Sequence, residues 1–144
     1  LERSGNFGKG SITGVYTVLV EGDDTNEPIS DTVRGILDGH IVLSRQLANE
    51  NHFPAIDIGA SISRLMVEIV SEEHQQIASR LRNLLGLYQK NADLISIGAY
   101  KKGVNPALDE AVSKINDINA FLQQGINERF SYEETLQYIR SIVG

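Results

Sequence analysis

Residues 12–20 read ITGVYTVLV, a nearly unbroken apolar run that is rich in β-branched side chains. Such a run is typical of a strand that is buried on both faces of a sheet. Two shorter apolar stretches follow, at 41–43 and 55–58, and segments that suit short helices separate the three stretches. This alternation of strands and helices predicts an α/β fold with a parallel sheet.

The pattern changes after Ser71, where apolar residues begin to recur at helical spacing. Ser71 precedes two glutamates, which favour the positive N-terminal end of a helix. Asn105 precedes Pro106, and residues 131–134 (SYEE) form a capping-box signature. The sequence therefore predicts three helices that begin at these signals and bury their apolar stripes against one another.

Together the two patterns place a domain boundary near Ser71. Residues 1–70 are expected to be the end of an α/β domain, and residues 71–144 a small all-α domain.

The composition excludes several classes of function. The formal net charge is −6, which argues against nucleic acid as a partner, because its phosphates require a basic surface. The sequence has no cysteine, so neither a disulfide nor a thiolate metal site can form. His40, His52 and His74 lack the spacing of metal ligands, and we expect no metal site from them. No apolar run approaches the ~18 residues that a transmembrane helix needs.

Residues 5–11 (GNFGKGS) contain a Gly-Lys pair but do not match a phosphate-binding loop. That motif requires a glycine separated by four residues from the Gly-Lys pair, and a Ser or Thr directly after the lysine. Arg3 and Gly10 occupy these two positions here. We expect an exposed loop instead.

Three short motifs are more informative: EGDD at 21–24, FPAID at 53–57 and SISR at 61–64. Their order and spacing resemble the ATP-driven motors of type III secretion, in the flagellar or the injectisome form. The sequence resembles the beta subunit of the rotary ATP synthase more loosely. The resemblance covers the whole chain, and it implies the C-terminal part of a RecA-like, parallel-sheet nucleotide-binding domain followed by a small helical domain.

Arg64 closes the third motif. From the residues alone, an arginine after a buried strand is most simply a structural ion pair. The resemblance implies another role, in which Arg64 reaches into the ATP site of the neighbouring subunit and offsets charge on the γ-phosphoryl group. A guanidinium group suits this role, because it stays charged and donates in a bidentate fork.

Phe53 and Pro54 begin the second motif, and their simplest interpretation is core packing at the start of a strand. The resemblance implies that the aromatic ring at this position stacks on adenine. A second aromatic residue from the helical domain is expected to complete that pocket. Tyr132 and Phe130 are both candidates for it.

Two charged loops are candidate partner sites. The first is acidic and includes Asp23, Asp24 and Glu27. It is either a solvated loop or, as the resemblance implies, the loop that meets a central shaft. The second carries Lys101 and Lys102 between two predicted helices, where the rotary beta subunit has an acidic lever. This difference, together with IGAY at 97–100, favours a secretion motor over a rotary subunit.

The resemblance thus implies a homohexameric ATPase that uses ATP and Mg²⁺ to drive protein export, located in the cytoplasm at the inner face of the bacterial membrane. Its implied partners are a central stalk protein, export chaperones and export substrates. The phosphate loop and the magnesium-binding acid are expected upstream of Leu1, so this chain alone is expected to be inactive. The alternative is a docking module for chaperones or a stalk protein, without catalysis of its own.

Overall fold

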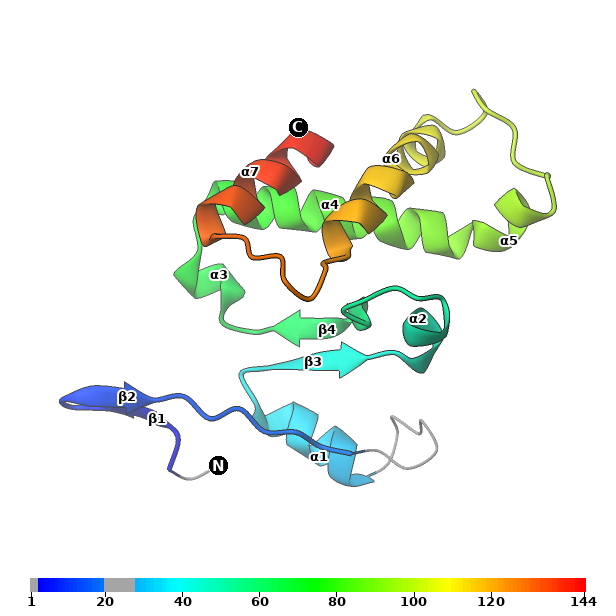
Figure 1. Cartoon of the computed structure of the whole chain (residues 1–144). Coiled ribbons are helices and arrows are strands. Elements are labelled where there is room, and N and C mark those ends of the chain that lie inside the picture. Colours follow the sequence, from blue (N-terminus) through cyan, green and yellow to red (C-terminus); the bar gives the residue numbers. More distant parts are fainter. Residues whose placement is uncertain (1–2, 20–27) are drawn as a thin grey trace. The chain divides into compact units, whose positions relative to one another are not determined.

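The computed structural model describes residues 3–19 and 28–144, which form two compact units, 1–37 and 38–144. In the first unit, strands β1 (Gly5–Phe7) and β2 (Gly10–Ile12) pair as an antiparallel hairpin. The hairpin is exposed along its length, which agrees with a surface position for the Gly-Lys segment. Helix α1 (Pro28–Ile36) follows. Figure 1 shows these elements in blue and cyan.

The strand predicted over 12–20 is not formed: β2 ends at Ile12, and residues 13–19 have no regular secondary structure. Val15 and Leu19 are 92% and 91% exposed. A strand is stable only when a neighbouring strand accepts and donates its hydrogen bonds, and no strand among the described residues pairs with this segment. The apolar run therefore has the composition of a buried strand without the partner that would bury it.

The second unit begins with strands β3 (Gly39–Leu43) and β4 (Ile56–Ser63), joined through the short helix α2 (Arg45–Asn49). The two strands are antiparallel, so the prediction of a parallel sheet is wrong for this pair. A parallel crossover must carry the chain back along the full length of a strand, usually through a substantial helix. The five-residue α2 does not do this. The Ser44 N–H instead donates to the Ala55 carbonyl at 2.9 Å and closes a hairpin-like connection.

The helical part of the prediction is confirmed. Figure 1 shows three long helices packed together beside β3 and β4, with shorter helices at the ends of α4. The helices of this part are α3 (Met66–Ile69), α4 (Glu72–Lys90), α5 (Ala92–Ser96), α6 (Pro106–Leu122) and α7 (Tyr132–Val143). Among the described residues, none of these helices has the length and apolarity needed to cross a bilayer.

All three long helices begin where the sequence predicts. The hydroxyl of Ser71 accepts from the His74 N–H, and the Asn105 side chain accepts from the Leu108 N–H. Ser131 and Glu134 form a reciprocal capping box. The Ser131 N–H and hydroxyl lower the pKa of Glu134 below its usual 4.5. This contribution to stability is therefore present above that pH and is lost as the pH falls through the lowered pKa.

The core lies between α4, α6 and α7. Ile118 on α6 and Val143 on α7 are its two largest fully buried side chains. The other buried members are Leu81, Leu84, Leu85, Ala111, Ile115, Ile139 and Ile142. Ion pairs also join these helices, for example Arg140 with Glu73 at 2.7 Å. Because that pair is exposed, it contributes only ~0–1 kcal/mol, and burial of the apolar stripes stabilises the three helices more.

Candidate nucleotide and partner sites

Arg64 directly follows β4, at the end of the β3–β4 pair. Its N–H donates to the Asp38 carbonyl at 2.7 Å, which fixes the backbone at this point. Gly39 lies opposite Ser63, and a Cβ at Gly39 would approach the Ile62 carbonyl oxygen to 2.7 Å. The two strands come this close only with glycine at that position. The Arg64 side chain is exposed, so a rigid strand end presents a charged group at the surface.

Phe53 and Pro54 lie between α2 and β4 and are joined by a cis peptide bond. The Phe53 carbonyl accepts from the Gln124 N–H at 2.9 Å, which connects this step to the loop that follows α6. Beside it, Nε2 of Gln123 lies 3.4 Å from Nδ1 of His52, whose side chain is buried. Two segments about seventy residues apart in the sequence are thus held side by side.

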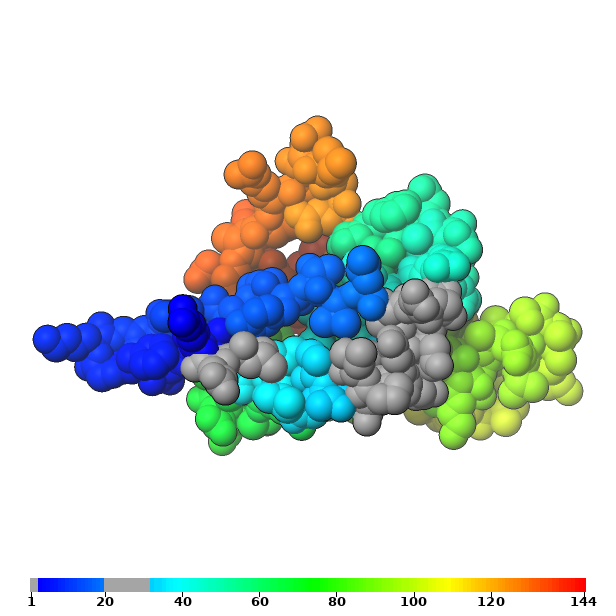
Figure 2. Space-filling view, turned by 90° about the horizontal axis from the view of Figure 1, so that it is seen from below, coloured from blue at the N-terminus to red at the C-terminus, as the bar shows by residue number. Residues whose placement is uncertain are grey.

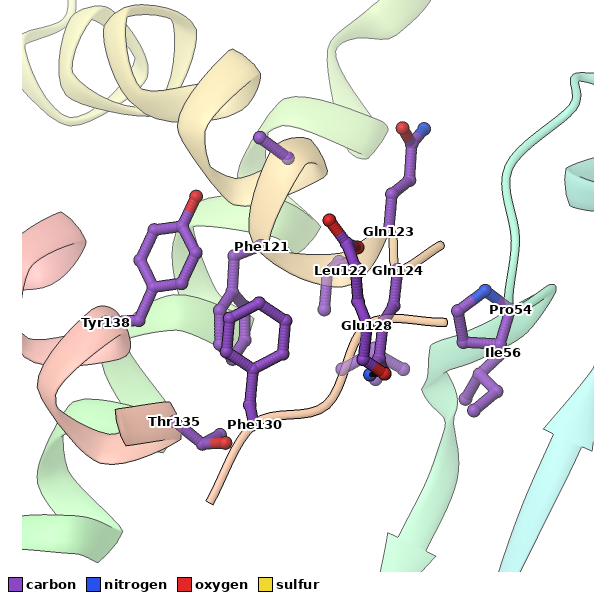
Figure 3. A pocket seen from close by; sticks show the side chains of 12 residues that line it. Pro54, Ile56, Phe121, Leu122, Gln123, Gln124, Glu128, Phe130, Thr135 and Tyr138 are labelled. Carbon is purple, nitrogen blue, oxygen red and sulfur yellow. Dashed lines mark hydrogen bonds between the residues drawn. The ribbon is translucent and has the colours of Figure 1, made fainter. Parts of the chain in front are cut away.

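A pocket of about 410 Å³ opens where these segments meet. Figure 3 shows Pro54 and Ile56 on one side of it and the rings of Phe121, Phe130 and Tyr138 on the other. The remaining lining residues are Ile58, Ala120, Leu122, Gln123, Gln124, Glu128 and Thr135. Most of the lining is apolar or aromatic, and the polar groups come from a few side chains, as is usual for small-molecule sites.

The aromatic side of the pocket has a defined geometry. The rings of Phe121 and Tyr138 meet edge to face, with centroids 5.2 Å apart and an interplanar angle of 80°. Glu128 accepts from the Gly125 N–H at 2.6 Å and folds the loop that completes the lining. Aromatic faces beside amide and carboxylate groups suit a flat ligand with polar edges.

The structure brings some of the predicted adenine contacts together and not others. Pro54 and Phe130 both line the pocket, whereas Phe53 and Tyr132 are not among its lining residues. The Tyr132 hydroxyl lies 2.9 Å from Nδ1 of His74, and the two rings meet edge to face with centroids 5.7 Å apart. Phe53 itself is half exposed.

The loop with Lys101 and Lys102 joins α5 to α6. One carboxylate holds it: the Tyr100 hydroxyl donates to Oδ1 of Asp109, and the Gly103 N–H donates to Oδ2 at 2.8 Å. The hydrogen bond to Asp109 raises the pKa of Tyr100 above its ordinary 10.0. Both lysines are exposed, and their ammonium groups make no ion pair within the described part of the chain.

The remaining candidates for a partner site are the acidic residues Asp23, Asp24 and Glu27. They lie outside the described residues. Within 3–19 and 28–144, no group of three or more His, Cys, Asp or Glu side chains could hold a metal ion.

Several residues that line the pocket were not predicted from the sequence. Gln124 and Glu128 carried no motif, because their partners are set by a loop conformation and by a contact across about seventy residues. Phe121 and Tyr138 did carry a signal. Phe121 lies three residues after the buried Ile118, and Tyr138 lies four residues before the buried Ile142, so helical spacing places both beside the core.

Two known protein families match consecutive parts of the chain. Residues 1–63 match the nucleotide-binding domain of the ATP synthase alpha/beta family, and residues 70–141 match the C-terminal domain of the type III secretion ATPase EscN. The flagellum-specific ATP synthase of Salmonella typhimurium is 54% identical over 139 residues, which are 95% of this chain and 30% of that protein.

Two solved structures are also similar. The assembled ATPase EscN from the type III secretion system of enteropathogenic E. coli superposes with a TM-score of 0.96 at 48% identity, over 99% of this chain and 35% of that one. EscN in complex with its central stalk EscO gives a TM-score of 0.89 at 46% identity, over 100% of this chain and 34% of that one. The chain therefore belongs to the family of type III secretion and flagellar export ATPases, within the ATP synthase alpha/beta family. It spans about a third of the length of these relatives.

Proposed function

We propose that this chain is the C-terminal part of a homohexameric ATPase that couples ATP hydrolysis to type III protein export. The observation that carries the proposal is the pair of consecutive family matches, 1–63 and 70–141, together with a TM-score of 0.96 to an assembled secretion ATPase. A flagellum-specific ATP synthase is 54% identical to this chain, and a type 3 secretion system ATPase is 50% identical to it. The proposal therefore covers the shared export function.

In this proposal the longer protein completes what the present chain lacks. Residues 1–70 belong to a RecA-like domain whose parallel sheet supplies a neighbour for the unpaired segment 13–19. Residues 71–144 form the C-terminal helical domain. The phosphate-binding loop and the acid that holds Mg²⁺ come from upstream sequence. The protein works in the cytoplasm at the inner face of the cell membrane, as a peripheral part of the export apparatus.

Within the chain, Arg64 acts on the ATP site of the adjacent subunit, and its exposed position at a rigid strand end supports this role. The step at Phe53 and Pro54 contributes to the adenine site. The pocket beside Pro54 favours Phe130 over Tyr132 as the second aromatic contact, because Phe130 lines it and the Tyr132 hydroxyl is engaged by His74.

The charged loops serve the partners. Lys101 and Lys102 dock an export chaperone, a substrate or the stalk protein, and the acidic loop with Asp23, Asp24 and Glu27 faces the ring axis. The assembly of a relative with a central stalk protein supports a stalk as one partner. A docking module without catalysis is the second candidate function, and the exposed lysine pair on a held loop is the observation that favours it.

A first prediction follows from the proposal that upstream sequence supplies part of the active site. The isolated 144-residue chain is expected to release no phosphate from Mg-ATP above background, because the groups that hold the phosphates and the metal are upstream. The longer protein is expected to hydrolyse ATP at a specific rate that rises with protein concentration and falls to background when EDTA removes Mg²⁺. Magnesium-dependent turnover by the isolated chain would contradict this division.

A second prediction separates the aromatic candidates. In the longer protein, Phe130→Ala is expected to weaken binding of a fluorescent ATP analogue about 5-fold or more, since stacking on a base contributes ~1–3 kcal/mol. Phe53→Ala is expected to weaken binding less than Phe130→Ala does, because Phe53 does not line the pocket, and Tyr132→Ala by less than about twofold. Titrations of the three variants by fluorescence anisotropy make the comparison. A larger loss for Tyr132→Ala than for Phe130→Ala would assign the contact to Tyr132.

A further inference from the structure

The part of the chain that carries Arg64 lies at the surface and buries little apolar area. Ile58 on β4 packs against the helical core, and it precedes Arg64 by six residues. After Arg64, Val67 and Ile69 are 66% and 72% exposed. Figure 2 shows green residues that follow β4 at the surface of the molecule. We call residues 61–70 the Arg64 segment, and polar contacts hold much of it in place.

The Arg64 segment begins beside an irregularity of the β3–β4 pair, whose register shifts between His40 and Val42. The Ser61 hydroxyl accepts from the Val42 N–H at 2.9 Å and donates to the Asp57 carbonyl at 2.6 Å. This hydroxyl therefore takes the place of a ladder hydrogen bond where the regular pairing is interrupted. Ser61 is thereby fixed relative to both strands, three residues before Arg64.

Helix α4 contacts the Arg64 segment at both of its ends. Nη2 of Arg82 donates to the Ser61 carbonyl at 3.3 Å. Nε2 of Gln75 donates to the Val67 and Val70 carbonyls, at 3.0 and 3.2 Å. Gln75 and Arg82 are seven residues apart, which is about two helical turns, so both project from the same face of α4. Their hydrogen bonds lie on either side of the arginine that the segment carries.

A groove separates much of the Arg64 segment from α4. It has a volume of about 780 Å³, and the segment lines it with Ser63, Met66 and Val67. Gln75 and Arg82 are among the residues that line it from α4. The helix itself is anchored by its buried leucines in the three-helix core. An anchored helix thus holds an exposed segment through the side-chain donors of two residues, across a groove that apolar side chains do not fill.

We propose that Arg82 and Gln75 are positioning residues for Arg64, which hold the backbone on both sides of it and so direct its guanidinium group toward the ATP site of the adjacent subunit. The proposal rests on the role given above to Arg64, and it adds the residues through which the helical bundle supports that role. Neither residue has to touch the nucleotide. Support of this kind matters because a misplacement of about 1 Å can lower a catalytic rate about 10²-fold.

The first test uses Arg82→Met in the longer protein, because methionine removes the donors and keeps a long side chain that suits a helix. This variant is expected to lower kcat about 10-fold, while affinity for a fluorescent ATP analogue changes by less than about twofold. Arg80→Met is the matched control, since Arg80 lies on the same helix and donates to Glu110 on α6. An equal loss in both variants, or an unchanged kcat in Arg82→Met, would overturn the role of Arg82.

Two further substitutions test the hydrogen bonds themselves. Gln75→Leu removes the donor at nearly the same size and is expected to lower kcat about 5-fold. Gln76→Leu is its matched control, because Gln76 is exposed at the next position of α4. Arg82→Lys keeps a charged donor, so it is expected to retain more of the rate than Arg82→Met. If Gln75→Leu behaves like Gln76→Leu, Gln75 has no positioning role.

A double-mutant cycle shows whether Arg82 acts through Arg64. If it does, the double variant Arg64→Ala/Arg82→Met has the same rate as Arg64→Ala alone, since no guanidinium group is left to position. Rate losses that multiply would mean that Arg82 acts elsewhere, and they would overturn the proposal. Melting temperatures of the longer protein, followed by circular dichroism, are expected to be equal for Arg82→Met and Arg80→Met. A fall confined to Arg82→Met would assign its loss of rate to stability.

Mixing gives a readout that a loss of stability does not produce. Arg82→Met is mixed with a variant that retains Arg64 and Arg82 and whose upstream phosphate loop is inactivated. Activity is expected to recover, because an intact phosphate site then receives a well-positioned Arg64 from its neighbour. No recovery, in a mixture where Arg64→Ala does recover, would overturn the positioning role.

The single variants separate this inference from the function on which it rests. A normal rate for Arg82→Met beside an impaired Arg64→Ala would refute the positioning role alone and leave the role of Arg64 intact. A normal rate for Arg64→Ala would refute the role of Arg64, and the positioning role would fail with it.

Discussion

Arg64→Ala is expected to lower ATP hydrolysis by the longer protein at least about 10²-fold, while its affinity for ATP changes little. The reason is the chemistry of phosphoryl transfer, in which an arginine that stabilises charge in the transition state contributes ~10³–10⁵ in rate. The same contact stabilises the ground state less than the transition state, so the variant loses turnover while its affinity for ATP changes little. The measurement is the steady-state rate against protein concentration, with nucleotide affinity measured on the same variant.

Two further variants test whether the guanidinium group is required and whether loss of any exposed arginine has the same effect. Arg64→Lys keeps the charge and loses the planar fork, so it is expected to recover only part of the rate. Arg80→Ala is the matched control, since it removes an exposed arginine whose ion pair with Glu110, at 2.7 Å, lies on the helical surface. Exposed pairs of this kind contribute little to stability, so the rate should stay close to wild type.

Mixing distinguishes a residue that acts across a subunit interface from one that acts within its own subunit. Arg64→Ala is mixed with a second variant that retains Arg64 and whose upstream phosphate loop is inactivated. If Arg64 acts in trans, mixed oligomers recover activity, because an intact phosphate site then receives Arg64 from its neighbour. No recovery would mean that Arg64 acts within its own subunit. An Arg64→Ala variant that keeps most of its rate would make Arg64 a structural residue of the β3–β4 pair.

The three long helices were predictable from the sequence because their signals are local. Ser71, Asn105 and Ser131 each cap a helix through a backbone N–H three residues later, and a motif of four residues is enough to indicate this. The sheet was predicted less well. The strand signal at 12–20 reports only composition, whereas a strand needs a partner that the described chain does not provide.

The pocket was also only partly predictable from the sequence, because tertiary contacts determine which residues line it. The pair at Phe53 and Pro54 was found through a family resemblance, and its neighbours were set by tertiary contacts. The Phe53 carbonyl accepts a hydrogen bond from the Gln124 N–H. This bond holds the loop that contains Phe130 near Pro54, so both residues line the pocket. Phe130 and Tyr132 are two residues apart, and the sequence could not choose between them. The choice depends on where α7 begins and on the contact of Tyr132 with His74.

Ile118→Ala is expected to destabilise the unit that contains the three-helix core by ~2–5 kcal/mol, the range for removing a large aliphatic side chain from a packed core. Ile118 is 0% exposed and lies in the cluster shared by α4, α6 and α7, so the variant leaves a cavity between three helices that cannot all close on it. Ile126→Ala is the matched control. Ile126 is 99% exposed in the loop after α6, and its loss should change stability by no more than about 0.5 kcal/mol.

Urea unfolding of the 144-residue chain, followed by circular dichroism at about 222 nm, compares the two variants. The pocket depends on the same packing, because the part of its lining that α6 supplies begins at Ala120, two residues after Ile118. In the longer protein, Ile118→Ala should therefore weaken nucleotide binding as the temperature approaches the lowered melting point, while Ile126→Ala should not. Equal stability of the two variants would mean that the three-helix core does not hold α6 in place, and the pocket would then need another source of rigidity.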